Sequence, residues 1–348
     1  MSDLNGAFRK NVFKALRDGS TYLTFNLLNR AIPFLLLPVL TSNIDPYGYG
    51  VIAVVALITS ISMPILGLCC NTVLYQRYFK MGEGEISKFI NDSYKIIIIN
   101  TIIAMLIAVL FSNFIENYLQ ISLLWFAIGI FIASVGMIST LTTTLFLIRK
   151  KPYSFGLFQL ALILINVVLT IFLVVLMKLS WEGRLISLAA VGCIMALVSV
   201  VINFRHGDLM VVDIKEASQV SNIVRLGGVL VPSAISGWAI LMVDRILLAS
   251  LTSLETLGIY AIGLMIAQLT DIFLASLGRA YQPYLFEYGG ADDLSSRIKI
   301  VQGMYLFIIV ALVVAGLVFM LAPIIMELMI NERYGSAVTV IGWLSLSN

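Results

Sequence analysis

Four charged side chains interrupt long apolar stretches of this 348-residue sequence, and they are the residues best placed to do chemistry. They are Arg30, Asp244, Arg245 and Asp271. A charged residue at the centre of a membrane-spanning helix costs roughly 2.5–3.5 kcal/mol on insertion scales, so each one implies a partner or a hydrated cavity. We therefore expect these four positions to mark where an apolar chain meets a polar ligand.

Arg30 shares a helical face with Asn26 and Asn29, because positions three and four apart are neighbours on a helix. Pro33 and Pro38 follow, and proline permits a bend in a spanning helix. A guanidinium binds phosphate through two parallel hydrogen bonds, so an anionic substrate group is the natural ligand of this face. The alternative is a structural ion pair with one of the intramembrane aspartates.

The other charges lie in two later apolar stretches. Asp244 and Arg245 are adjacent, so their side chains diverge by about 100° on a helix and face different partners. Arg245 is close enough to the end of its stretch to extend toward the membrane surface, which leaves both a binding and an anchoring role open. Asp271 and Gln268 lie on a helical stripe that leads toward Arg279, where a carboxylate can carry a coupling proton or make a packing hydrogen bond.

Membrane-spanning helices must position these residues. Hydrophobic residues make up 60% of the chain and charged residues 12%, against about 25% in soluble domains. One crossing takes about 20 apolar residues, and the alternating strands of a membrane barrel are absent from the sequence. The sequence predicts an all-α polytopic membrane protein with nine complete transmembrane helices and a truncated tenth. The ten stretches are 20–41, 49–68, 96–115, 119–148, 155–177, 185–203, 226–250, 257–278, 301–322 and the short 336–348.

The few basic residues predict the orientation. Loops on one side hold 17 of the 22 Lys and Arg residues and loops on the other side hold three, which include Lys178 and Arg184 in the loop 178–184. Basic loops stay in the cytoplasm, so we expect a cytoplasmic N-terminus. The predicted inner loops are 1–19, 69–95, 149–154, 204–225 and 279–300.

The loops lack the signatures of an enzyme. They contain no Gly-rich phosphate cradle, no HExxH and no Ser/His/Asp arrangement, and the longest outer loop, 323–335, is short. Cys69, Cys70 and Cys193 have no metal-site spacing, so neither a metal nor another cofactor is expected. A net charge of +3 without a basic cluster beyond what topology requires makes nucleic acid an unsuitable partner.

Residues 40–53 are similar to residues 248–261 when the chain is shifted by 208 positions. In each segment a helix end, a short turn and a Gly-hydrophobic helix start follow one another. This predicts two pseudo-repeated helical bundles around a central cavity, and transporters often bind substrate between such halves. The expected domains are an N-terminal six-helix bundle (1–203), a cytoplasmic linker (204–225) and an incomplete C-terminal bundle (226–348).

Several segments with this spacing resemble the polysaccharide-repeat flippases, which are the Wzx-type O-antigen transporters of the multidrug/oligosaccharidyl-lipid/polysaccharide exporter superfamily. The resemblance covers essentially the whole chain, and the spacing carries most of its specificity. The segments are Asn29–Pro33 with Pro38, Asp45–Val51, Gln76–Phe79, Asp244–Leu248, Leu257–Ala261 and Pro283.

The resemblance implies a V-shaped pair of six-helix bundles in the bacterial inner membrane. It implies transfer of undecaprenyl-pyrophosphate-linked oligosaccharide to the periplasmic leaflet for O-antigen, lipopolysaccharide or another surface polysaccharide. By position, Arg30 and Arg77 would line the first half of the cavity, and Asp244, Arg245 and Asp271 the second. The implied partners are the lipid-linked glycan, membrane lipids, a polysaccharide polymerase and a chain-length regulator. Against the family's usual twelve helices, we expect the sequence to stop within the tenth.

Three alternatives stay open at this point. A drug or metabolite antiporter of the same superfamily would need only a small-molecule cavity and acids for ion coupling. A membrane glycan polymerase or acyltransferase would need a long outer loop, which the sequence does not predict. A scaffold subunit without transport would pair its intramembrane charges only with one another.

Overall fold

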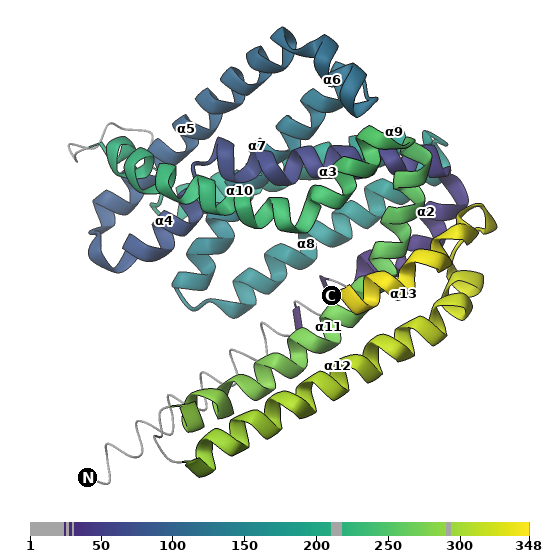
Figure 1. The fold of residues 1–348 in the computed structure, drawn as a ribbon. Coiled ribbons are helices and arrows are strands. Elements are labelled where there is room, and N and C mark those ends of the chain that lie inside the picture. The colour runs from purple at the N-terminus through teal and green to yellow at the C-terminus, as the bar shows by residue number, and fades with distance from the viewer. Residues whose placement is uncertain (1–23, 26–27, 30, 210–217, 290–293, 348) are drawn as a thin grey trace.

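The computed structural model describes residues 24–25, 28–29, 31–209, 218–289 and 294–347, without the side chains of 272 and 275–299. All regular structure in this part of the chain is helical. In order, the elements are α2 (Leu37–Asn43), α3 (Pro46–Leu66), α4 (Cys70–Arg77), η1 (Tyr78–Lys80), α5 (Glu83–Leu110), α6 (Ser112–Leu119), α7 (Leu123–Ile148), α8 (Pro152–Thr170), η2 (Ile171–Leu176), α9 (Ser180–Arg205), α10 (Val220–Leu251), α11 (Leu254–Gly289), α12 (Leu294–Met329), η3 (Glu332–Ala337) and α13 (Val338–Ser347) (Figure 1).

Seven helical segments in the described residues are long and apolar enough to cross a membrane. They are α3, α5, α7, α8 continued by η2, α9, α10 and α12. Large apolar side chains such as Ile240 on α10 and Met320 on α12 are mostly exposed, as expected for surfaces that face lipid. The predicted all-α membrane protein is confirmed, whereas the count of nine crossings, the tenth and the domain boundaries stay predictions.

The predicted inner loops were too long. The loop expected over 69–95 contains α4 and the first turns of α5, where Ile86, Phe89 and Ile90 are buried. Likewise, α10 begins within the expected linker, and α11 and α12 extend into the expected loop 279–300. In α5 the reason is that the first turns are amphipathic, so they bury Ile86, Phe89 and Ile90 against protein without forming an apolar run.

The helix that precedes α3 is interrupted by a turn between Pro33 and Pro38, where the sequence was expected to permit a bend. Residues 31–35 are helical, Leu36 forms a turn, and α2 starts at Leu37. Pro38 has no N–H to donate to the preceding turn, which explains the break. Asp45 then caps α3 by accepting a hydrogen bond from the Gly48 N–H at 3.0 Å.

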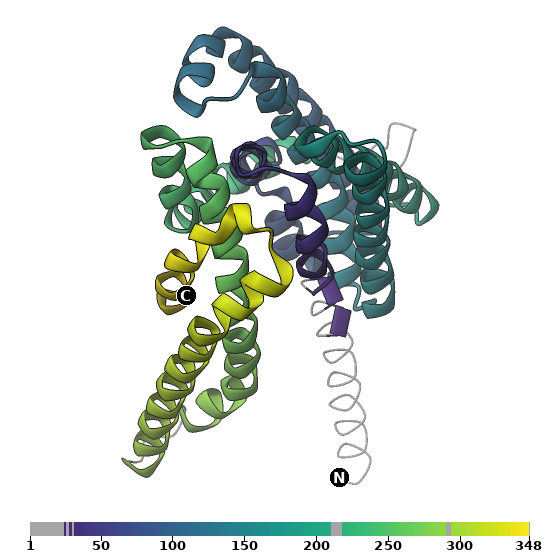
Figure 2. The ribbon, with the colours of Figure 1, turned by 90° about the vertical axis from the view of Figure 1, so that its right-hand side faces the viewer.

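Most of the helices pack as one body, and α11 and α12 run side by side away from it (Figures 1 and 2). One end of the protein holds α4, Arg149, the last residue of α11 (Gly289) and the first residue of α12 (Leu294). We call it the basic end. The opposite end holds Asn43, Thr252 and η3.

Early and late helices meet through an apolar core at the opposite end. Leu37 and Ile44 belong to the same buried cluster as Ile262 and Tyr334. The Tyr334 hydroxyl donates to the Ile44 carbonyl oxygen at 2.9 Å. These contacts close this end of the protein between the two parts of the chain.

Two glycines bring α3 and α11 into backbone contact at the same end. A Cβ on Gly50 would overlap the carbonyl oxygen of Leu254, and a Cβ on Gly258 would overlap that of Pro46. Gly50 and Gly258 are 208 positions apart, and so are Pro46 and Leu254. The contact is therefore reciprocal between segments that the sequence comparison aligned.

At the basic end, α10 is fixed to the first part of the chain. Its preceding residue Gln219 donates its N–H to the Asp92 carboxylate at 2.8 Å, and the Ser218 hydroxyl donates to the same oxygen at 3.2 Å. A Cβ on Gly227 would overlap the carbonyl oxygen of Leu68, so α10 packs closely on the turn after α3.

Candidate functional site

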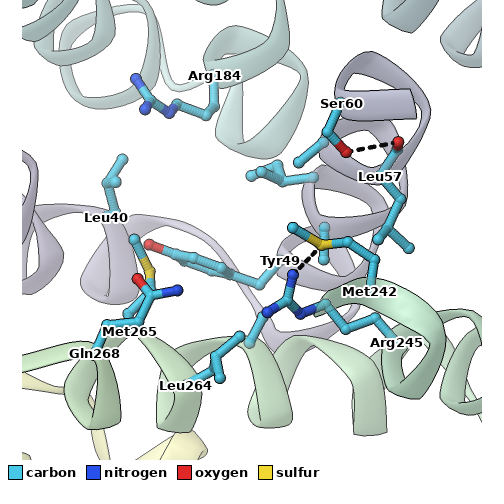
Figure 3. Close-up of a pocket in the computed structure, with 14 residues that line it drawn as sticks. Leu40, Tyr49, Leu57, Ser60, Arg184, Met242, Arg245, Leu264, Met265 and Gln268 are labelled. Atoms are coloured by element: carbon cyan, nitrogen blue, oxygen red, sulfur yellow. Dashed lines mark hydrogen bonds between the residues drawn. The ribbon is translucent and has the colours of Figure 1, made fainter. Parts of the chain in front are cut away.

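A cavity of about 360 Å³ lies between helices from both parts of the chain. Most of its lining is apolar, with a small number of polar groups, as is usual for a ligand-binding cavity. Figure 3 shows Arg184 on one wall and Arg245, Met265 and Gln268 on the facing wall. The full lining is Leu40 from α2; Tyr49, Ile52, Ala53, Ala56, Leu57 and Ser60 from α3; Arg184 from α9; Met242 and Arg245 from α10; and Ala261, Leu264, Met265 and Gln268 from α11.

Arg184 is held only by neutral oxygens. Its Nη1 donates to Asn166 Oδ1 at 2.5 Å and to Thr170 Oγ1 at 2.6 Å, both on α8. A guanidinium has five N–H donors, so three remain for a ligand. Among the described residues, Arg184 forms no ion pair with a carboxylate. Its positive charge is therefore uncompensated at the wall of a membrane-embedded cavity.

Arg245 is placed differently on the facing wall. It donates from Nη1 to the Met242 sulfur, which is a weak acceptor, and its buried Nε has no partner. The neighbouring Asp244 instead accepts a hydrogen bond from the Tyr260 hydroxyl on α11. The predicted divergence of these adjacent side chains is thus confirmed, and Arg245 keeps donors available to the cavity.

Two uncharged groups add to the polar lining. Tyr49 is 5% exposed, and its buried hydroxyl has no hydrogen-bond partner. The Ser60 hydroxyl donates to the Leu57 carbonyl and accepts from the Trp238 indole at 2.8 Å, which ties α10 to α3. The unpaired Tyr49 hydroxyl is a donor that a ligand can satisfy, because an unsatisfied buried polar group is costly.

These groups together suit an anion. None of the residues that line the cavity is Asp or Glu, and both arginines present unused N–H groups. A phosphate or carboxylate bound there would satisfy buried donors and offset the cost of the uncompensated charge. The arrangement offers binding and electrostatic attraction, and the lining holds no nucleophile with an adjacent base.

Of the predicted site residues, Arg245 and Gln268 line the cavity. Asp244 and Asp271 are half-buried and belong to the same two helices without lining it, and Arg77 ends α4 at the basic end. The carboxamide oxygen of Asn29 is buried and without a partner. Arg30, Asn26 and the Arg279 side chain lie outside the described part of the chain.

Sequence reasoning missed Arg184, which was assigned to the outer loop 178–184. That assignment was wrong, because α9 begins at Ser180 and carries Arg184 on its second turn. A charged residue at the edge of an apolar stretch is easily counted with the loop. The signal for Ser60 was available, since shifting Gln268 by the repeat offset of 208 gives that position.

A third arginine, Arg149, shows a guanidinium that is paired with a carboxylate. Arg149, which follows α7, donates to both carboxylate oxygens of Asp208, one of them at 2.6 Å, and from Nε to the Tyr78 hydroxyl at 2.9 Å. These hydrogen bonds to Asp208 raise the pKa of the Arg149 guanidinium. This cluster lies at the basic end and ties η1 to the segments after α7 and α9.

The seven helices that are long and apolar enough to span a membrane define a polytopic helical membrane protein, and several of them line the cavity. The chain belongs to the polysaccharide biosynthesis protein family, whose sequence profile matches residues 15–288. This membership confirms the resemblance drawn from the motifs.

Two proteins of Haemophilus influenzae are similar to the chain. One, described as an uncharacterized membrane protein, is 22% identical over 273 residues, which are 78% of this chain and 65% of that protein. The other, described as Lsg locus putative protein 1, is 22% identical over 286 residues, which are 79% of this chain and 66% of that protein. The chain thus spans about two thirds of each relative's length. No solved structure matches the chain.

Proposed function

We propose that the chain belongs to a transporter that moves an undecaprenyl-pyrophosphate-linked oligosaccharide across the bacterial inner membrane for surface polysaccharide synthesis. The observation that carries this proposal is the uncompensated charge of Arg184 at a cavity between the two parts of the chain. Membership of the polysaccharide biosynthesis family supports a glycan as the cargo. The pyrophosphate supplies the anion, and the apolar lining suits the lipid or its attachment point.

The cavity lining supports two repeated halves. Six residues of α3 line the cavity, and for four of them the residue of α11 that lies 208 positions later lines it as well. Together with the reciprocal glycine contact, this supports a pseudo-twofold axis that passes between α3 and α11. The pairs are Ala53 with Ala261, Ala56 with Leu264, Leu57 with Met265 and Ser60 with Gln268.

The closed opposite end supports alternating access. Gly50 and Gly258 allow α3 and α11 to touch there, and the Tyr334 hydroxyl bonds across the same end. If the basic end is cytoplasmic, as the charge bias predicts, this state accepts substrate from the cytoplasm and is sealed toward the periplasm. Release then requires the backbone contact between the two helices to separate, and the coupling ion would supply the driving force.

The lining favours transport over enzymatic alternatives. It holds no carboxylate, imidazole or thiol, so it lacks the groups that a glycan polymerase or acyltransferase needs for acid–base or nucleophilic work. An antiporter of cationic drugs would place acids in its cavity, whereas this cavity holds two arginines. The remaining alternative, a scaffold, would leave Arg184 without a role in flux.

Transport of the lipid-linked oligosaccharide by the whole protein in proteoliposomes tests the proposal. We expect Arg184→Ala to lower the transport rate by about 10–100-fold, because a charge-assisted hydrogen bond contributes roughly 1.5–3 kcal/mol. Arg184→Lys should retain part of the rate, since a lysine keeps the charge but loses the guanidinium fork. Lys151→Ala, which removes an exposed charge at the basic end, is the matched control.

An unchanged rate for Arg184→Ala, at equal protein incorporation, would contradict the proposed anion contact. Transport of a small drug by the wild-type protein, without transport of the glycan lipid, would favour the antiporter instead.

A further inference from the structure

We propose that Asn166, assisted by Thr170 and Ser187, is a positioning residue that fixes the Arg184 guanidinium while leaving its positive charge available to an anionic substrate. This inference rests on the proposed function and adds residues that neither the sequence motifs nor the cavity lining identified. The three residues form a hydrogen-bonded cradle for Arg184, and none of them lines the cavity that Arg184 lines.

The two hydroxyl residues of the cradle are buried, whereas Asn166 is half-buried and lines a second cavity. Thr170 and Ser187 are both 0% exposed, and their hydroxyl oxygens lie 2.9 Å apart. Thr170 accepts from Arg184, and Ser187 donates to the Arg184 carbonyl oxygen at 2.7 Å. The Thr170 hydroxyl hydrogen therefore has two acceptors, Ser187 at 2.9 Å and Asn166 Oδ1 at 3.4 Å, of which Ser187 is the nearer. The hydrogen bonds thus run from the guanidinium through two hydroxyls back to the backbone of the same residue, and such chains reinforce one another.

Asn166 provides the strongest hold. Its Oδ1 accepts from Arg184 Nη1 at 2.5 Å and from the Thr170 hydroxyl at 3.4 Å. Thr170 is the last residue of α8 and directly precedes the π-helical segment Ile171–Leu176. Segments of π-helix occur frequently at functional sites. The α8 register therefore brings an amide and a hydroxyl, one turn apart, onto the same guanidinium nitrogen.

The chemistry of this partner matters. An aspartate at position 166 would have nearly the same shape as asparagine and would accept the same hydrogen bond more strongly. It would also cancel the charge of Arg184 and hold its donors in an ion pair. The amide oxygen orients the guanidinium without that neutralisation, so the full charge faces the cavity.

The variant Asn166→Asp separates positioning from structural support. In the whole protein we expect it to lower glycan-lipid transport at least about tenfold while the melting temperature stays equal or rises, because the new ion pair replaces a neutral hydrogen bond. Thr170→Val should lower transport less, by about two- to fivefold, since it removes one of two acceptors. Asn222→Asp, which adds the same charge near the start of α10, is the control and should transport normally.

The outcomes are distinguishable. If Arg184→Ala abolishes transport and Asn166→Asp does not, the positioning role is wrong and the proposed function stands. If Asn166→Asp lowers the melting temperature and transport together, the residue is merely structural and the inference is overturned. If neither variant affects transport, the anion contact at Arg184 is wrong and the positioning role falls with it, whereas the proposed function fails only if the wild-type protein does not transport the glycan lipid.

Discussion

Arg149 and Arg184 are the same residue type in two regions of one molecule, and they have opposite kinds of partners. At the basic end, Arg149 makes a two-pronged ion pair with Asp208 and a third bond to Tyr78. At the cavity, Arg184 is held by an amide and a hydroxyl and meets no carboxylate among the described residues. The charge of the first guanidinium is paired with a carboxylate of the protein, and that of the second is not.

Under the proposed function, the difference separates a structural arginine from a binding one. A carboxylate neutralises a guanidinium and fixes neighbouring segments together, which is useful where the chain must hold its shape. Neutral oxygens orient a guanidinium and leave its charge for a ligand, at a cost in stability that bound substrate offsets. Removing a partner should therefore reduce stability in the first region and transport in the second.

The largest stability effect is expected at the basic end. Asp208→Asn leaves Arg149 without its carboxylate, and the Asp208 and Arg149 side chains are only 7% and 19% exposed. We expect the free energy of unfolding to fall by about 1–3 kcal/mol, measured by thermal unfolding in detergent, with transport per folded molecule unchanged. If Asp208→Asn lowered transport without lowering stability, it would contradict the distinction between a structural Arg149 and a binding Arg184.

Smaller effects are expected at Tyr49 and Tyr334, whose rings pack edge to face with their centroids 5.6 Å apart. Tyr49→Phe removes a hydroxyl that has no partner in the protein, so it should weaken binding of a pyrophosphate lipid about 3–10-fold and change stability by less than about 0.5 kcal/mol. Tyr334→Phe, which removes the bond to Ile44, is the matched control and should cost about 0.5–1.5 kcal/mol of stability. Equal binding by wild type and Tyr49→Phe would remove this hydroxyl from the site.

The sequence predicted the helical membrane class because lipid demands long apolar runs, and that demand is visible in composition alone. It predicted Arg245 and Gln268 because charged and amide side chains are rare in such runs. It misassigned Arg184, since this residue stands at the first turns of α9, where an apolar window stops. It also shortened α5, α11 and α12; in α5 the missed turns pack on protein and carry no apolar run.

The neutral partners of Arg184 could not have been predicted from spacing. Asn166 and Thr170 are one turn apart on α8, but only the packing of α8 against α9 brings them to Arg184. The similarity at an offset of 208 positions covers only a short segment, yet the same offset extends further along α3. It relates four α3 residues that line the cavity to the four α11 residues that line it.

The most direct test of an anion site in this cavity is a comparison of two ligands that differ only in charge. Binding of a short isoprenyl pyrophosphate and of the corresponding uncharged alcohol would be measured with the purified whole protein and with Arg184→Ala. We predict that the wild type binds the pyrophosphate at least about tenfold more tightly and that Arg184→Ala removes this preference. Equal affinities in the wild type, or a preference that persists without Arg184, would contradict the assignment.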